Sequence, residues 1–397
     1  MSSPTTPELG VGMVGYAFMG AAHSQAWRTA PRFFDLPLQP RMRAVVGRNA
    51  ARVAEAAARQ GWESSGTDWR RLLERDDIDL VDVCTPGDTH AEIAIAALDA
   101  GKHVLCEKPL ANSVAEAQAM VEAAARAEAN GVRAMVGFTY RRVPAIALAR
   151  QLVAEGRIGT VRHVRAQYLQ DWIADPSAPM SWRLVKETAG SGALGDIGAH
   201  IIDLTQFITG ERITTVNGMM ETFVHERPLP GDGGGDLGKQ TTTGGGMGRV
   251  TVDDAAAFLA RFNGGAMGVF EATRFATGRK NAIRVEINGS IGSLAFDFED
   301  MNLLHFYDAE EPSTTAGFRR IIATEPDHPY AGAWWPPGHL LGYEHGFTHQ
   351  AVDLLNAIAE GSRPSPSFEE GLQVQSVLEA VEESSGSGAW TDVKSEG

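Results

Sequence analysis

The sequence is poor in cysteine, in surplus positive charge and in long apolar runs. Only two cysteines occur among its 397 residues, Cys84 and Cys106, and both lie in short apolar stretches, which predicts small buried side chains rather than disulfides or a metal cluster. The 50 acidic residues outnumber the 35 Lys and Arg and give a net charge of -15, which argues against a nucleic-acid-binding surface. No apolar run reaches the roughly 18 residues of a membrane span.

The remaining composition is typical of a soluble globular protein, with 43% hydrophobic and 21% charged residues. A chain of this length exceeds one small core and suits two domains. Residues 1–8 are polar and contain prolines, without a basic region followed by an apolar stretch. We therefore expect no signal peptide and a cytoplasmic protein.

A short apolar strand at residues 9–14 runs directly into a glycine-containing turn and an amphipathic segment. This order is typical of a dinucleotide-binding turn, in which the first glycine permits a tight bend and the last lets the helix pack on the strand. A small residue between them lets the backbone approach a pyrophosphate. The residues expected to contact the cofactor are Gly15, Ala17, Phe18, Met19 and Gly20.

The second predicted strand, residues 42–46, ends without the acidic residue that commonly holds the adenosine ribose of NAD. Gly47 stands there, followed by Arg48. A missing carboxylate beside a cation is the pattern expected for a 2'-phosphate, so the pair slightly favours NADP over NAD. The alternative is that Arg48 faces solvent and adenosine is held otherwise.

Helices and strands continue to alternate through residue 138, which predicts a parallel, doubly wound Rossmann sheet. We expect helices at 50–60, 68–74, 89–100 and 113–129, and strands at 79–84, 103–106 and 133–138. Ser113 and Glu116 form a capping box at the longest of these helices. Ligands of such sheets lie beyond the carboxyl ends of the strands. The residues that fall there are Thr85, Pro86, His90, Glu107, Lys108 and Tyr140.

From about residue 141 the pattern becomes a helix (143–155) followed by β-branched or alternating runs at 159–170, 250–262, 266–274, 282–288 and 292–298. We expect an α+β domain with a large, mostly antiparallel sheet. Its open face must bury its apolar side against something, and another subunit is one candidate. The predicted division is a dinucleotide-binding domain at 1–140 and a substrate-binding and oligomerisation domain at 141–397. The glycine-rich residues 228–248 are expected to be a long loop without assigned chemistry.

Two other groups leave alternatives open. The aromatic loop at 328–337 suits sugar stacking and a subunit contact equally well. His345 and His349, four residues apart on a predicted helix, have metal-ligand spacing but lack a third ligand, so we assign no metal site.

The segment 190–203 carries Asp196, His200 and Asp203 after a glycine-rich entry. On a helix, spacings of four and three place the three side chains on one face. An imidazole with carboxylates one turn away is a candidate general base, because the carboxylates fix its tautomer and stabilise the imidazolium. The alternative is a capped helix with solvated aspartates and a half-buried histidine.

Several motifs occur together in a fixed order: GMVGYAFMGAAH at 12–23, CTP at 84–86, GKHVLCEKPL at 101–110 and the segment 190–203. In this combination the chain resembles the glucose-fructose oxidoreductase/inositol dehydrogenase (Gfo/Idh/MocA) family over nearly its whole length. FTYRR at 138–142, YLQDW at 168–172 and SWR at 181–183 look most like its levoglucosan dehydrogenase branch. Ala17 in place of a glycine and Gly47 in place of the ribose acid depart from the family pattern.

The resemblance implies an NAD(P)-dependent enzyme that transfers a hydride between a nicotinamide and a secondary hydroxyl of a sugar, anhydrosugar or cyclitol, and a dimer or tetramer. By this resemblance Lys108 binds the reacting hydroxyl beside the nicotinamide, His200 is the base, Asp196 orients the substrate and Asp203 supports the histidine or relays its proton. Further candidates are Tyr140, Arg142, Gln170, Asp171 and Trp172 for the substrate, and Trp182 and Arg183 for the cofactor. Some of these side chains can instead build the domain interface.

Three other functions fit the sequence less well. Some relatives are glycosidases with a tightly held nicotinamide, but nothing in this chain is assignable to leaving-group protonation. Cofactor-sensing regulators share the fold, yet they need not keep Lys108, Asp196 and His200 together. A metal-dependent hydrolase built on the 190–203 segment is disfavoured because the cluster has a single histidine.

Overall fold

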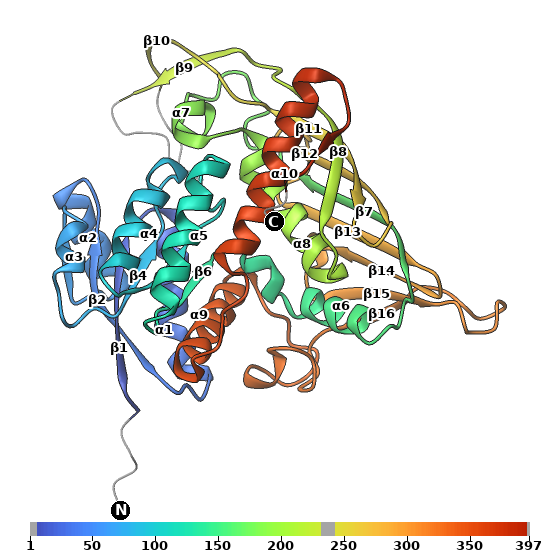
Figure 1. Ribbon diagram of the computed structural model, residues 1–397, viewed down its shortest axis with the longest axis horizontal. Coiled ribbons are helices and arrows are strands. Elements are labelled where there is room, and N and C mark those ends of the chain that lie inside the picture. Colours follow the sequence, from blue (N-terminus) through green and yellow to red (C-terminus); the bar gives the residue numbers. More distant parts are fainter. Residues whose placement is uncertain (1–5, 232–242, 395–397) are drawn as a thin grey trace, which may run out of the picture. The chain divides into compact units, whose positions relative to one another are not determined.

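The computed structural model describes residues 6–231 and 243–394, and the chain divides into two compact units. Unit 1 comprises Met1–Thr139 and Tyr343–Leu372, and unit 2 comprises Tyr140–Gly342 and Gln373–Gly397. Each unit is built around its own sheet (Figure 1). None of the described helices is both long and apolar enough to cross a membrane.

Unit 1 holds a six-stranded parallel sheet in the order β3-β2-β1-β4-β5-β6, which confirms the Rossmann prediction. The strand order reverses between β1 and β4, and at such a switch point the loops separate to leave a ligand crevice. The strands are β1 Glu8–Val14, β2 Gln39–Val46, β3 Ser64–Gly66, β4 Leu80–Val83, β5 His103–Cys106 and β6 Ala134–Val136. The helices are α1 Phe18–Phe33, α2 Ala50–Gln60, α3 Arg70–Leu73, α4 His90–Asp99, α5 Val114–Glu128 and α9 Tyr343–Glu360.

Local sequence signals account for these elements. The Ser113 side chain accepts the Glu116 N–H at 3.2 Å, so the predicted capping box begins α5. Strand β1 is buried on both faces after its first residue, as a central parallel strand requires. Late in the chain, α9 returns to this unit, where Phe347 and Leu354 join the same core as Val11 and Trp27.

Unit 2 holds a nine-stranded sheet in its described residues, in the order β16-β15-β14-β13-β7-β12-β11-β8-β17. Every neighbouring pair is antiparallel except β12 with β7, which confirms the mostly antiparallel prediction. The strands are β7 Val161–Leu169, β8 Ile213–Glu221, β11 Ala255–Phe262, β12 Met267–Thr273, β13 Ala282–Gly289, β14 Gly292–Asp297, β15 Leu303–Asp308, β16 Arg319–Ile322 and β17 Thr391–Asp392. Helices α6 Pro144–Ala154 and α8 Ala199–Thr209 contact one face of this sheet.

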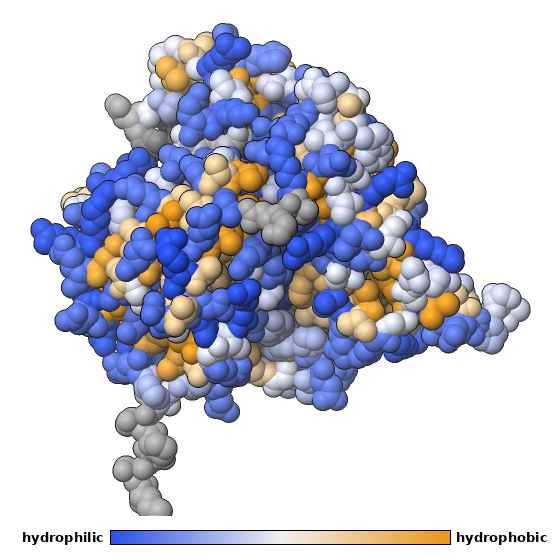
Figure 2. Space-filling model, in the orientation of Figure 1, coloured by the Kyte–Doolittle hydropathy of each residue, from blue (hydrophilic) through white to orange (hydrophobic). Residues whose placement is uncertain are grey.

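The opposite face of the sheet carries exposed apolar side chains. Burial alternates residue by residue along β11, and the outward positions on β8, β11 and β12 include Met219, Leu259, Met267 and Val269, of which Leu259 and Val269 are cross-strand partners. On the face of the molecule drawn in Figure 2, hydrophilic residues surround smaller apolar patches, as the composition predicts.

The prediction of a structureless loop at residues 228–248 is wrong for its described part. Strands β9 Glu226–Pro230 and β10 Thr243–Arg249 form an antiparallel pair, and residues 232–242 lie outside the described residues. Strand pairing uses main-chain groups, so a glycine-rich strand forms without the side-chain alternation by which strands are predicted. Strands β8, β15 and β16 were also not predicted.

Candidate active site

The turn after β1 requires glycine at both of its ends. Gly15 has φ +105°, and a Cβ there would lie 2.5 Å from the carbonyl oxygen of Cys84. A Cβ on Gly20 would lie 2.3 Å from the Gly15 oxygen, so α1 begins directly against the turn. Ala17 is the residue that precedes this helix, and Phe18 is exposed. The amide-lined start of a helix held this close to the turn fits a pyrophosphate.

The ring of Tyr16 lies against position 47, where the ribose acid is absent. A Cβ on Gly47 would lie 2.1 Å from Cε1 of the Tyr16 ring, so the ring occupies the space that any side chain at 47 would need. The neighbouring Arg48 is exposed. The glycine therefore fits the position of Tyr16 and does not by itself indicate a 2'-phosphate.

His90 connects the loops after β4 and β5. Its ring is 1% exposed, with Nε2 2.9 Å from the carbonyl oxygen of Thr85 and Nδ1 3.0 Å from that of Pro109. Thr89 adds a hydroxyl bond of 2.7 Å to the Thr85 Oγ1. The predicted cofactor contacts Thr85, Pro86 and Lys108 thus lie on loops that His90 fixes, while both of its own nitrogens face main-chain oxygens.

A buried charged group beneath these loops was not predicted from the sequence. His23 of α1 lies between two carboxylates, with Nδ1 2.9 Å from Asp82 Oδ1 on β4 and Nε2 2.9 Å from Glu107 Oε1 after β5. Trp27 Nε1 donates to Asp82 Oδ2 at 2.7 Å. The second oxygen of Glu107 accepts the N–H of Lys108 at 3.2 Å. Through these contacts, α1 holds the main chain of the lysine that the family resemblance places beside the nicotinamide.

Electrostatics favour the charged form of His23. Burial opposes the imidazolium, but the Asp82 carboxylate and the Cys84 sulfur together outweigh it and hold the pKa of His23 well above its usual range. Donor atoms of His23, Asp82 and Cys84 lie within 4.8 Å of one another, a spacing that a metal ion also needs. Hydrogen bonds already use both imidazole nitrogens, which accounts for the group without an ion.

In unit 2, the segment 190–203 begins its helix with a π turn, Leu194–Gly198, that continues as α8. The three predicted side chains lie at different depths: Asp196 is 28% exposed, His200 8% and Asp203 1%. The Asp203 carboxylate accepts from Arg141 Nε at 2.8 Å and is also paired with its Nη2. A bidentate guanidinium stabilises the ionised carboxylate, so Asp203 carries a fixed negative charge below His200.

Two tyrosines enclose the His200 ring. The Tyr140 ring lies edge-on at 4.7 Å between centroids, and the Tyr168 ring lies at 5.8 Å. A chain of hydrogen bonds continues from their hydroxyls, which are 2.9 Å apart, to Asn281 Oδ1 at 2.6 Å from the Tyr168 hydroxyl. Gln170 Nε2 donates to the same Asn281 oxygen at 2.8 Å, and Trp172 Nε1 donates to Gln170 at 3.0 Å.

The structure therefore brings Tyr140, Gln170 and Trp172 into one polar network next to His200. Asn281 completes this network and was missed, because a single asparagine before a strand carries no sequence signal. Asp171, adjacent in sequence, instead accepts from Lys280 at 2.8 Å and from the Gly278 N–H, and the Lys280 bond lowers the pKa of its carboxyl.

The other predicted contacts lie in unit 2 as well. Arg142 is 1% exposed, on the short helix that follows Thr139. Arg183 stacks on the adjacent Trp182 ring at 4.3 Å. One member of the histidine pair on α9, His349, has a packing role. Its side chain is fully buried, and its ring centre lies 5.9 Å from that of Phe34.

Comparison with known proteins agrees with this architecture. Residues 9–138 match the model of an oxidoreductase family with an NAD-binding Rossmann fold, and residues 146–295 match the GFO/IDH/MocA C-terminal domain. Levoglucosan dehydrogenase of Pseudarthrobacter phenanthrenivorans is 44% identical over 387 residues, which cover 97% of this chain and 98% of that protein.

Solved structures extend the likeness to three dimensions. An oxidoreductase domain protein from Kribbella flavida is 72% identical, with a TM-score of 0.93 over 98% of this chain and 100% of that one. Levoglucosan dehydrogenase in complex with NADH and levoglucosan is 43% identical, with a TM-score of 0.90 and the same coverage. The levoglucosan dehydrogenase complex holds NADH, so the comparisons give no support to the expectation of NADP.

Replacing His23 with Gln removes the cation between two buried carboxylates, and we expect it to lower the free energy of unfolding by about 3 kcal/mol at neutral pH. The folded-state pKa of His23 is raised, so its stabilisation is complete below the unfolded value of about 6.5 and is lost as the pH rises through the raised pKa. Thermal unfolding measured across pH should show the difference from wild type shrinking in the alkaline range.

His103→Gln is the matched control, because burial lowers the pKa of His103 to about 4 and leaves it neutral. Its effect on stability should stay constant from neutral to alkaline pH. A His23→Gln deficit that is independent of pH would contradict the assignment of an imidazolium.

Proposed function

This chain belongs to the Gfo/Idh/MocA family of oxidoreductases, and we propose that it is a dehydrogenase that oxidises a secondary hydroxyl of a pyranose or anhydrosugar with NAD. The observation that carries the proposal is the 44% identity, over nearly the full length of both chains, with a protein named levoglucosan dehydrogenase. The Lys108, Asp196 and His200 set of the family resemblance is complete in this chain.

We assign the proton transfer to His200. The cofactor, when bound, supplies the hydride acceptor, and alcohol oxidation then needs a base for the hydroxyl proton. The rings of Tyr140 and Tyr168 hold the imidazole in one orientation, and the Asp203 charge below it favours the imidazolium that forms. Because Arg141 keeps Asp203 ionised, its role is support rather than relay of the proton.

The part-exposed Asp196 and the Gln170–Trp172 network provide the polar groups for the sugar. Asp196 remains reachable from solvent, as a carboxylate that accepts a substrate hydroxyl must be. The Trp172 ring offers an apolar face beside hydrogen-bonding groups, a combination that suits the mixed surface of a pyranose. Lys108, on the loop after β5, positions the reacting oxygen. That the protein works in the cytoplasm stays a prediction from its sequence.

We propose NAD as the cofactor for two reasons. Three solved complexes of levoglucosan dehydrogenase, at 42–43% identity, contain NADH. Within this chain, the contact between Tyr16 and Gly47 explains the missing acid without a 2'-phosphate.

A panel of pyranoses, anhydrosugars and cyclitols, each tested with NAD and with NADP, measures both parts of this proposal by the absorbance of the reduced cofactor. We expect reduction of NAD by an anhydrosugar or a pyranose, and a lower kcat/KM with NADP. Glycoside cleavage without net reduction would identify a glycosidase instead, and faster turnover with NADP would reverse the cofactor assignment.

His200→Ala should lower kcat by about 10²- to 10⁴-fold, the usual contribution of a general base. Binding of NADH, followed by its fluorescence, should be retained. His225→Gln is the control, since His225 is exposed and lies between β8 and β9, outside the residues assigned to the site. Unchanged turnover in His200→Ala would remove the histidine from the mechanism.

We also propose that the open face of the nine-stranded sheet packs against a second copy of the chain. Leu259, Val269, Met219 and Met267 are between 39% and 66% exposed on neighbouring strands. A cluster of exposed apolar residues of this kind is typical of a protein interface.

Leu259→Glu should therefore shift the protein from oligomer to monomer in sedimentation-velocity runs. Ile291→Glu places the same charge at an exposed apolar position in the turn between β13 and β14, outside this apolar cluster, and should leave the mass unchanged. A monomeric wild-type protein at micromolar concentration would contradict the proposal.

A further inference from the structure

Arg274, the residue after β12, is a fully buried cation that contacts several segments of the candidate site. Its side chain is 0% exposed. Nη2 donates to the Asp253 carbonyl oxygen at 3.0 Å, and Nη1 lies 3.5 Å from the Arg183 carbonyl oxygen. The same Nη1 lies 3.7 Å from Oδ2 of Asp196, and the guanidinium lies 5.5 Å from the centre of the Trp172 ring. One side chain thus contacts Arg183, Asp196 and Trp172, which the sequence had indicated separately.

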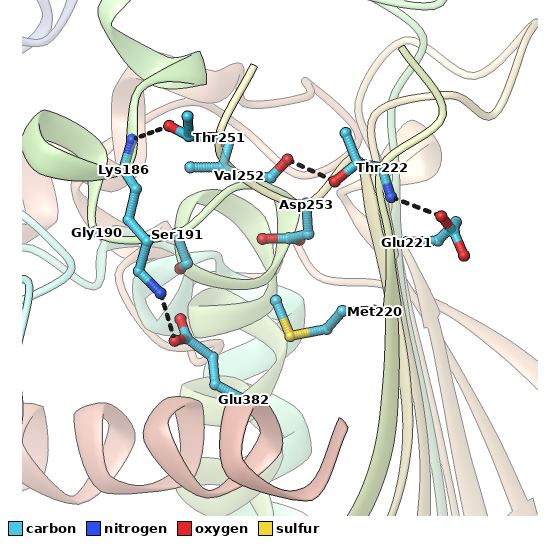
Figure 3. A pocket seen from close by; sticks show the side chains of 10 residues that line it. All are labelled: Lys186, Gly190, Ser191, Met220, Glu221, Thr222, Thr251, Val252, Asp253 and Glu382. Carbon is cyan, nitrogen blue, oxygen red and sulfur yellow. Dashed lines mark hydrogen bonds and ion pairs between the residues drawn. The ribbon is translucent and has the colours of Figure 1, made fainter. Parts of the chain in front are cut away.

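The turn that leads into the helix of Asp196 is pressed onto this cation. A Cβ on Gly192 would lie 2.8 Å from Arg274 Nη2 and 1.7 Å from the Asp253 oxygen, so no other residue fits there without movement. The Asp253 carboxylate accepts the N–H groups of Gly192 at 2.6 Å and Leu194 at 2.8 Å. Figure 3 shows the Asp253 side chain directed toward Gly190 and Ser191, on the wall of a small pocket.

Arg274 differs from Arg227, a second buried arginine nearby, in the groups that it contacts. Arg227 donates to the carbonyl oxygens of Ile173 at 2.6 Å and Asp175 at 2.8 Å, and so it serves the main chain. The carboxylate of Asp254 likewise binds main chain, since it accepts the N–H of Phe223 at 2.8 Å. Burial raises the pKa of Asp253, and the Arg274 charge opposes that shift. Arg274 is the cation of this group that also faces the carboxylate of Asp196.

We propose that Arg274 is a positioning residue that keeps Asp196 ionised and aimed at the substrate. The ion pair at 3.7 Å favours the carboxylate form, while the 28% exposure of Asp196 leaves it accessible to a sugar hydroxyl. An ionised Asp196 accepts that hydroxyl and stabilises the imidazolium on His200. The inference rests on the proposed function for the role of Asp196, but the contact with Arg274 is testable without turnover.

The kinetic test compares Arg274→Gln and Arg274→Lys in the full-length protein with NAD and the sugar found in the panel. Arg274→Gln should raise KM for the sugar about tenfold with a smaller effect on kcat, because Asp196 loses the cation that holds and orients its carboxylate. Arg274→Lys keeps the charge and should restore KM. Arg227→Gln is the matched control: it should lower the melting temperature without changing KM. An unchanged KM in Arg274→Gln overturns the proposal.

The second test needs no activity. Asp196→Asn should lower the melting temperature more when Arg274 is present than in the Arg274→Gln background, since only the former leaves a buried cation without its partner. Equal shifts in both backgrounds overturn the proposal. If Arg274→Gln does not fold, Arg274→Met replaces it in this cycle, because methionine also removes the charge and is unbranched, and equal shifts then overturn the proposal in the same way. A wild-type chain that oxidises no sugar refutes the proposed function, and this cycle still decides the pairing.

Discussion

A charge buried in protein must be paired, and in this chain paired charges support the segments to which we assign the chemistry. His23 joins α1 to the ends of β4 and β5, and through Glu107 it reaches the main chain of Lys108. Arg141 fixes Asp203, and Arg274 fixes the turn before Asp196. Removing one partner of such a pair costs several kcal/mol, which makes these positions rigid. Rigid support is what a hydride-transfer site needs, because small displacements of the reacting groups reduce the rate strongly.

Much of the fold follows from local signals in the sequence. The alternation of apolar strands with helices through residue 138 predicted the parallel sheet, and the capping box at Ser113 marked the start of α5 to within one residue. The glycine turn predicted the cofactor-binding end of that sheet, because its backbone permits few other residues. Strands with strict alternation, such as β11, were found, whereas the glycine-rich β10 and the irregular β8 were not. A regular side-chain period is visible in a sequence, and main-chain pairing is not.

From residue spacing alone, without the family resemblance, the candidate site was predictable only where its residues are close in sequence. Asp196, His200 and Asp203 lie within eight positions of one another, and their spacing alone suggested a base with carboxylates nearby. Arg274, Asn281 and the partners of His23 approach from distant strands, and no local pattern indicates them. The amphipathic pattern of α9 predicted a helix but not that it packs on the dinucleotide-binding unit. The Gly47–Arg48 pair shows the same limit, since its interpretation depended on where the Tyr16 ring lies.

That last contact constrains how cofactor preference can evolve in this chain. An acidic residue at position 47 and a large ring at position 16 compete for the same space, so the two positions are epistatic. An acid at position 47 requires the tyrosine ring to turn away from its present place, whereas a smaller residue at 16 leaves the space open. A change of the residue that meets the adenosine ribose is therefore coupled by packing to a change at position 16.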